Sequence, residues 1–229
     1  QITIAQARQE ASSIFLAKVF NWMAMGLGLT GVIAYLTAST GLARAIVGSP
    51  LFMVLLFAEL GLVFYLSARI DKIQASTAAA LFVGYSAMNG VTLSAVFLAY
   101  TSSSIAGTFF ITAGMFGAMA LYGMVTKRDL SGLGSFLFMG LIGIIIASIV
   151  NIFLGNSGLG WMISVLGVFI FTGLTAYDVQ KIKAMGEEGI LEQGEAAVKK
   201  GSIIGALALY LDFINLFLML LRFFGGSRD

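Results

Sequence analysis

The chain of 229 residues has no cysteine, no histidine and a single proline, and charged residues make up only 10% of it. Without cysteine and histidine it has no thiol nucleophile, no disulfide, and neither of the side chains that dominate structural zinc sites and haem ligation. A histidine-based acid–base pair is also excluded, and no other nucleophile and base stand at a recognisable spacing. We therefore expect no enzymatic activity and no cofactor, and any proton or metal chemistry must use carboxylates.

The shortage of charge also excludes a soluble protein. A soluble domain carries about 25% charged residues, whereas this chain is 59% hydrophobic and has a mean hydropathy of +0.98. A formal net charge of +2 offers no concentrated basic patch, so nucleic-acid binding is not expected. The composition is typical of a polytopic membrane protein, whose first partner is the lipid bilayer.

Seven segments are apolar enough to cross the bilayer, which takes about 20 residues of helix. They lie near residues 18–38, 51–68, 76–98, 104–125, 133–154, 161–178 and 202–222. The 28 glycines, many of them inside these segments, indicate close packing between helices. We predict an all-α bundle of seven transmembrane helices in a single domain, residues 18–229, with the seventh helix at its centre.

Two polar stretches border the predicted helices. Residues 1–17 are predicted to be a polar cytoplasmic tail without fixed structure. The stretch from about residue 177 to 201 is expected to be mostly a loop, although the sixth helix could continue through Lys183 as an amphipathic end. With seven crossings, ten of the thirteen basic residues fall on the side of the N-terminus. The positive-inside rule then predicts a cytoplasmic N-terminus, and one re-entrant segment would bring the C-terminus to the same side.

Five ionisable residues lie in or at the ends of predicted spans: Glu59, Arg69, Asp178, Asp212 and Arg222. Such groups are costly inside a bilayer and so indicate function by default. The second and seventh helices are antiparallel, and ten residues, or about 15 Å of helix, separate the acid from the arginine in each. Glu59 could therefore pair with Arg222, and Arg69 with Asp212 or Asp178. Static ion pairs that only hold the bundle together are the alternative.

Among these ionisable residues, Asp178 and Asp212 are the more specific candidates for a functional site, because both belong to the predicted inner half of the membrane. Two carboxylates in one desolvated site cannot both ionise cheaply, so the pair should share a proton. At low pH the shared proton would close a passage, and at higher pH two repelling carboxylates would offer oxygen atoms to a hard cation such as calcium. We expect a weak calcium path past Glu59, Asp178 and Asp212. Proton-coupled transport of another substrate is an alternative.

Several motifs resemble the bacterial branch of the Bax inhibitor 1 family, also called the transmembrane Bax inhibitor motif family. The resemblance runs from about Phe15 to the C-terminus and is most specific in two adjacent stretches, residues 117–122 (GAMALY) and 126–131 (TKRDLS). Residues 177–180 (YDVQ) look like the aromatic-Asp-x-Gln end of the family's sixth helix. Residues 209–217 (LYLDFINLF) look like its signature in the seventh helix.

The resemblance implies a pH-sensitive calcium leak in a bacterial inner membrane, with Asp178 and Asp212 as the pH sensor. It also implies that Arg69, at the inner end of the second helix, forms a gating salt bridge with that sensor. Glu59 and Arg222 match the family's glutamate in the second helix and its arginine in the seventh. Calcium would be the permeating ion and protons the regulating ligand.

A second class of function fits the same resemblance. Some bacterial members resemble modulators of the membrane-bound AAA protease, which act by protein contact instead of transport. The tail formed by residues 1–17 would then be the contact segment, and its deletion would separate the two hypotheses.

Overall fold

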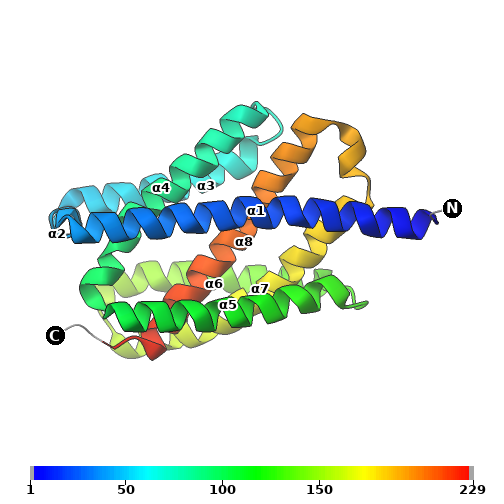
Figure 1. Ribbon diagram of the computed structural model, residues 1–229. Helices are drawn as coiled ribbons and strands as arrows, with labels where there is room; N and C mark the ends of the chain where they lie inside the picture. Colours follow the sequence, from blue (N-terminus) through cyan, green and yellow to red (C-terminus); the bar gives the residue numbers. More distant parts are fainter. Residues whose placement is uncertain (1–2, 227–229) are drawn as a thin grey trace. The chain divides into compact units, whose positions relative to one another are not determined.

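The computed structural model describes residues 3–226, which are almost entirely helical and contain no β-strand element (Figure 1). The elements in chain order are α1 (Ile4–Ser39), α2 (Leu42–Val47), α3 (Pro50–Arg69), α4 (Ala75–Ala99), α5 (Ser102–Val125), α6 (Ser131–Leu154), α7 (Ser157–Glu187), the 3-10 helix η1 (Ile190–Gln193) and α8 (Glu195–Phe224).

Seven of these helices are long and apolar enough to span a membrane, which confirms the predicted fold class. In α8, 67% of the most apolar stretch is buried, against 50% in α7 and less in every other span. The last span is thus the most enclosed, as predicted for a central helix. Large side chains such as Phe153, Phe64 and Phe169 are mostly exposed on the other spans, where acyl chains would cover them.

The helices form two compact units. The first contains residues 3–102 and 182–210, and the second contains residues 103–181 and 211–226. One boundary falls at the start of α5, and the other two fall inside α7 and α8, so that α7 and α8 each contribute to both units. Asp178 and Asp212 belong to the second unit, whereas Glu59 and Arg69 belong to the first.

The start of α1 corrects one prediction. The sequence predicts a tail without fixed structure, but the helix begins at Ile4 and continues without interruption into the first span; residues 1–2 of that tail lie outside the described residues. Thr3 and Gln6 form a capping box, in which Gln6 Oε1 accepts from the Thr3 amide at 2.8 Å and Thr3 Oγ1 accepts from the Gln6 amide at 3.3 Å. The polar composition of this stretch therefore marks an exposed helix and not a disordered tail.

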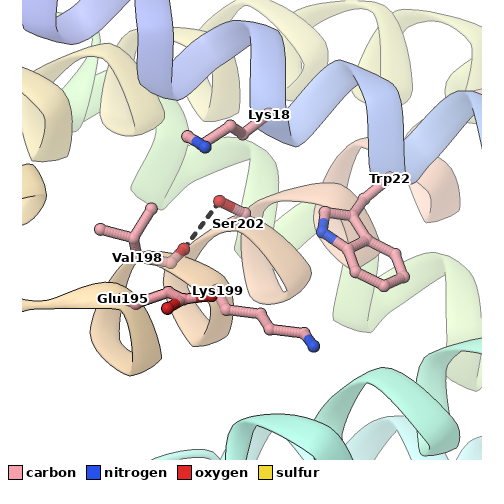
Figure 2. A pocket seen from close by; sticks show the side chains of 6 residues that line it. All are labelled: Lys18, Trp22, Glu195, Val198, Lys199 and Ser202. Carbon is pink, nitrogen blue, oxygen red and sulfur yellow. Dashed lines mark hydrogen bonds between the residues drawn. The ribbon is translucent and has the colours of Figure 1, made fainter.

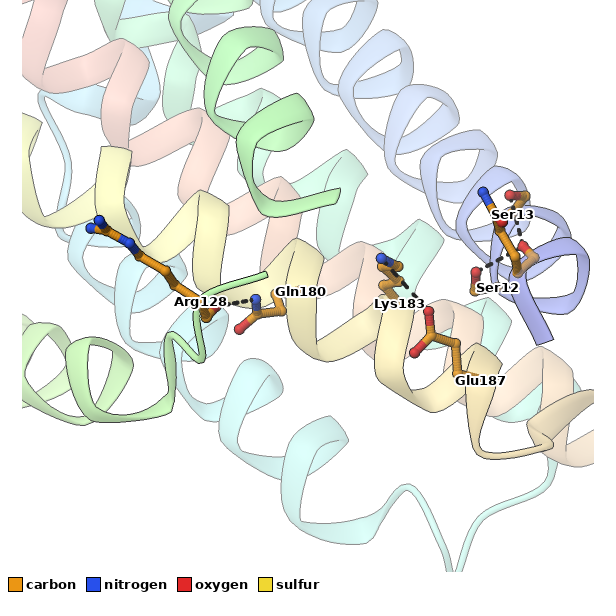
Figure 3. Close-up of polar contacts among 7 residues, drawn as sticks. Ser12, Ser13, Arg128, Gln180, Lys183 and Glu187 are labelled. Atoms are coloured by element: carbon orange, nitrogen blue, oxygen red, sulfur yellow. Dashed lines mark hydrogen bonds and ion pairs between the residues drawn. The ribbon is translucent and has the colours of Figure 1, made fainter. Parts of the chain in front are cut away.

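The end of α7 corrects a second prediction, because the sequence places the end of the sixth span near residue 178. The helix instead runs to Glu187, beyond even the alternative end at Lys183. Lys183 Nζ and Glu187 Oε1 form an ion pair at 3.6 Å along this extension (Figure 3). Gly186 lies so close to the main chain of Ser12 on α1 that no Cβ would fit between them. Packing within the first unit thus explains why a polar segment stays helical.

The core of the first unit lies between α1, α4 and the first half of α8. Helices α1 and α4 pack against each other, crossing obliquely in Figure 1, and approach closely at Gly90, which leaves no space for a Cβ against Thr30 and Ile33. Tyr210 on α8 is fully buried, and its hydroxyl lies 2.6 Å from Thr30 Oγ1. Its ring packs edge-to-face on Tyr85, with the ring centroids 5.7 Å apart.

The core of the second unit is built around the second half of α8. Phe213 packs edge-to-face between Phe109 and Phe116 of α5, with centroid distances of 5.4 and 5.5 Å. A buried cluster joins α6, α7 and α8 through Leu137, Phe171, Leu174, Leu216 and Leu220. These contacts place Asp178 and Asp212 on two helices that share one apolar core.

Gly123 on α5 offers a test of how closely the second unit is packed. A Cβ at this position would overlap the main chain of Ala176 on α7, which cannot rotate away. We expect Gly123→Ala to lower the free energy of unfolding by about 1–3 kcal/mol, the usual cost of overpacking. Thermal unfolding in detergent would measure the loss.

Gly117 provides the matched control, because it lies on the same helix and a methyl group added there would meet no atom within 4 Å. Gly117→Ala should leave stability unchanged or raise it by up to about 1 kcal/mol, through the better helix propensity of alanine. Equal effects of the two substitutions would contradict the packing described for Gly123.

Candidate functional site

The side chains of Asp178 on α7 and Asp212 on α8 contact each other within the second unit through a hydrogen bond between their carboxyl groups. Asp212 is 4% exposed, and its Oδ2 atom is buried without a hydrogen-bond partner. Asp178 is half-buried, and the ammonium group of Lys181 lies close enough to act on it electrostatically. The two residues that the sequence singled out as a pair are therefore brought together.

The contact sets a chemical condition on the pair. A carboxylate accepts hydrogen bonds but cannot donate them, so a hydrogen bond between two carboxyl groups exists only while one of them holds a proton. When both are ionised, two negative charges face each other in a poorly hydrated place. The Asp178–Asp212 pair can thus take two arrangements, one protonated and in contact and one doubly charged and repelled.

Three close contacts hold the segment of α7 that carries Asp178, residues 176–180. Ala176 packs against Gly123 of α5, and the ring of Tyr177 packs against Gly134 of α6 so closely that neither glycine could carry a Cβ. Gln180 binds the main chain of the loop between α5 and α6: its Nε2 donates to the Arg128 carbonyl at 2.8 Å, and its Oε1 accepts from the Leu130 amide at 2.9 Å. The site is thereby fixed on several sides.

Sequence reasoning missed a role for Gln180. The residue appears in the motif of residues 177–180, but nothing in the sequence says which main chain its amide would meet. A glutamine at a helix end can as well face solvent, and only the fold brings the loop 126–130 to it.

Glu59 lies in the first unit and has a neutral partner. The residue is 8% exposed, and its Oε1 accepts a hydrogen bond from Thr92 Oγ1 on α4 at 2.8 Å. Asn89, one turn before Thr92, donates from Nδ2 to the Tyr85 hydroxyl at 3.3 Å. An intramembrane carboxyl group is therefore accompanied by hydroxyl and amide groups from α4.

The two arginines of the predicted ion pairs lie at helix ends. Arg69 is the last residue of α3 and is exposed, and its carbonyl accepts from the amides of Lys72 and Ile73. Arg222, near the end of α8, places its guanidinium group on Gly160 at the start of α7. The pairs Arg69 with the aspartates and Glu59 with Arg222 each join residues of different units, and both stay predictions.

Two surface pockets are alternative ligand sites to the aspartate pair. In the first unit, a pocket of about 170 Å³ is lined by Lys18, Trp22, Glu195, Lys199 and two neighbours (Figure 2). The lysine ammonium groups point apart in Figure 2, and a carboxylate shares the lining, so the pocket selects neither charge. A shallow pocket of about 380 Å³ in the second unit is lined by hydroxyl and apolar groups and has no charged residue.

Acidic residues do not form a dedicated metal centre in the part of the chain that the structure describes. No three acidic side chains there come together as a group able to hold a metal ion. Stable calcium sites use six to eight oxygen ligands. A cation that meets the Asp178–Asp212 pair would therefore be held weakly.

Seven helices long and apolar enough to span a membrane, two of which carry a pair of hydrogen-bonded aspartates, define a multi-pass membrane protein whose polar chemistry rests on carboxyl groups. A family model described as "Inhibitor of apoptosis-promoting Bax1" matches residues 12–229. The inner membrane protein YbhL of Escherichia coli K12 is 52% identical over 216 residues, which cover 93% of this chain and 92% of YbhL. The chain belongs to the Bax inhibitor-1 family.

Relatives in other bacteria show a similar level of identity. A protein of Borreliella burgdorferi is 49% identical over 232 residues, which cover 100% of this chain and 99% of the relative. A protein of Deinococcus radiodurans is 47% identical over 216 residues, covering 94% of this chain and 91% of the relative. The family resemblance read from the sequence motifs is thus confirmed over nearly the whole chain.

The hydrogen bond to Glu59 leads to a prediction about the first unit. Thr92→Val removes the hydroxyl and leaves a buried carboxyl group without this donor, so we expect a loss of about 1–3 kcal/mol in the free energy of unfolding. Thr92→Ser keeps the hydroxyl and should lose much less. The midpoint of thermal unfolding in detergent would measure both, and equal losses would show that the methyl group and not the hydrogen bond matters.

Proposed function

We propose that this protein is a pH-responsive calcium leak of the bacterial inner membrane, gated by the proton shared between Asp178 and Asp212. The observation that carries the proposal is the hydrogen bond between these two carboxyl groups inside the second unit. Family membership and the similarity to an inner membrane protein of E. coli support the location. Seven spanning helices supply the scaffold that a conducting path needs.

The direction of the pH response follows because the hydrogen bond between Asp178 and Asp212 exists only while one carboxyl group holds a proton. At acidic pH one proton is retained, the carboxyl groups stay in contact, and α7 and α8 are held together at this point. As the pH rises and the proton leaves, two carboxylates repel each other and the contact opens. Leak should therefore be low at acidic pH and high at alkaline pH.

The same carboxyl groups account for interaction with calcium. Asp212 Oδ2 is a buried acceptor without a partner, and such a group is stabilised by a proton or a cation. Once ionised, the pair would attract a divalent cation without enclosing it, which suits conduction because an ion must also leave. Glu59, with its hydroxyl partner Thr92, would line the same path as a third carboxyl group.

Arg69 would form the inner salt bridge to the ionised aspartates, and Arg222 would pair with Glu59 toward the outer face. With the N-terminus in the cytoplasm, as the distribution of basic residues predicts, the aspartate pair lies in the inner half of the membrane. Calcium entry would then be controlled by the pH of the cytoplasmic side.

Calcium flux into dye-loaded proteoliposomes at mildly acidic and mildly alkaline pH tests the proposal. We expect flux through the wild-type chain to rise with pH, and Asp178→Asn and Asp212→Asn each to remove that rise. An asparagine keeps the shape and a hydrogen-bond donor but cannot lose a proton in this range. No flux at any pH, or an unchanged pH response in both variants, would refute the gate.

Asp129→Asn is the matched control. Hydrogen bonds from the hydroxyl and then the main-chain amide of Ser131 hold the pKa of the fully exposed Asp129 below its ordinary value. Any stabilisation that it provides is lost only as the pH falls through this lowered pKa, so Asp129 stays ionised at both pH values of the assay. Asparagine keeps a side-chain oxygen that can accept from the Ser131 amide, so the substitution should leave the pH response of the flux unchanged.

A second candidate function, modulation of a membrane-bound AAA protease by protein contact, is favoured by one observation. The first turns of α1 form an exposed helix, with Ile4 77% exposed, and such a helix can dock on a partner. This exposed surface precedes the packing of Ser12 on Gly186 and is separate from it.

Deletion of residues 1–10 separates the two functions. A calcium leak formed by the spans should keep its flux and pH response, because Ser12 and its contact with α7 remain. A contact-dependent effect on protease activity should be lost in the same variant. Co-reconstitution with the purified protease would measure the second effect, and loss of flux on deletion would count against an independent leak.

A further inference from the structure

Gln180 fixes the loop between α5 and α6 through both ends of its amide. The Nε2 group donates to the carbonyl of Arg128 at 2.8 Å, and Oε1 accepts from the amide of Leu130 at 2.9 Å. Both partners are main-chain groups, and Figure 3 shows the guanidinium group of Arg128 pointing away from Gln180. We call these two hydrogen bonds the Gln180 clasp. The clasp depends on where the loop lies and not on which side chain residue 128 carries.

The clasped loop is internally braced. Thr126 Oγ1 accepts from the Arg128 amide at 3.3 Å, and Asp129 Oδ1 accepts from the Ser131 amide at 2.8 Å. Leu130 is only 5% exposed, so the end of the loop is anchored in the core. These contacts hold the loop together, and Gln180 connects the loop to α7.

Gln180 and Asp178 point to different sides of α7. Two residues turn a helix by about 200°, so the side chain of Asp178 reaches α8 while that of Gln180 reaches the loop. Ala176 and Tyr177 meet Gly123 and Gly134 on the remaining sides. The loop thus contacts α7 on the face opposite Asp178, within one turn of that residue.

We infer that Gln180 is a positioning residue for the aspartate pair: by binding the main chain of residues 128–130, it holds this segment of α7 so that Asp178 stays in reach of Asp212. The inference rests on the proposed function for its consequence, since holding the pair together keeps the leak closed. The loop 126–130 would then stabilise the closed state of the leak. Without the clasp, α7 can move away from α8 while the protein remains folded.

The charged groups around Asp178 are few, so other titrations do not obscure the effect. Asp212 faces it from α8, and Lys181 lies close on α7 itself. Helices α5 and α6 contain no charged residue. The loop carries Lys127, Arg128 and Asp129, all exposed.

The first arm of the test measures the position of the loop and needs no calcium. Because the chain has no cysteine, spin labels can be placed at Lys127→Cys and Met162→Cys without other changes. Met162 is an exposed residue of α7, about 27 Å along the helix from Gln180. We expect a single narrow distance distribution in the full-length protein and a broad one after Gln180→Leu.

The second arm measures flux in proteoliposomes. Gln180→Leu should raise calcium flux at acidic pH about tenfold, the order expected when two hydrogen bonds that favour the closed state are lost. Flux at alkaline pH should stay near the wild-type value, whereas misfolding would lower flux at both pH values. Gln180→Glu, which keeps the acceptor for Leu130 but loses the donor to Arg128, should give an intermediate increase.

Two control variants have defined outcomes. Gln193→Leu replaces an exposed glutamine of η1 and should change neither distance nor flux. Arg128→Ala removes the side chain but keeps the main-chain carbonyl, so the distance distribution should stay narrow.

An unchanged distance distribution in Gln180→Leu would overturn the inference, and so would a broadened distribution with wild-type flux at acidic pH. If the wild-type chain conducts no calcium at any pH, the proposed function fails, and with it the consequence for closure. The spin-label distances then still decide whether Gln180 holds the loop.

Discussion

A hydrogen bond between two carboxyl groups depends on a proton, and this condition governs how the second unit of the protein can behave. Asp178 and Asp212 meet on helices that share an apolar core, where water does little to screen two negative charges. The packing of Phe213 and Leu216 on α8 fixes one partner. The close contacts of Ala176 and Tyr177 fix the other.

The glycines explain how polar groups are tolerated in so apolar a protein. Lipid gives no hydrophobic force between spans, so close approach of backbones must supply the association. Gly123 and Gly134 bring α5 and α6 against α7, and Gly90 brings α4 against α1. Rigid contacts of this kind keep a few buried polar side chains, such as Glu59 with Thr92, in defined pairs.

The part of α7 from Ala176 to Glu187 combines the proposed pH sensor with contacts that hold the fold together. This segment carries the aspartate, the clasp of Gln180 on the loop, and the extension to Glu187 that packs on α1 through Gly186 and Ser12. A helix that would have ended near Asp178 would have left the carboxyl group on a frayed terminus. Continuation of α7 beyond the apolar span gives the aspartate a fixed backbone on both sides.

The sequence alone determined the class, the seven spans, the family and the two aspartates, because hydropathy and isolated ionisable residues are local properties. It did not determine the helical start at Ile4 or the end at Glu187, since both segments are polar and are stabilised by a capping box and by packing on each other. The partners of Gln180 and Glu59 were likewise decided only in the tertiary structure. A hydrogen bond to a main-chain carbonyl 52 residues away leaves no pattern in sequence.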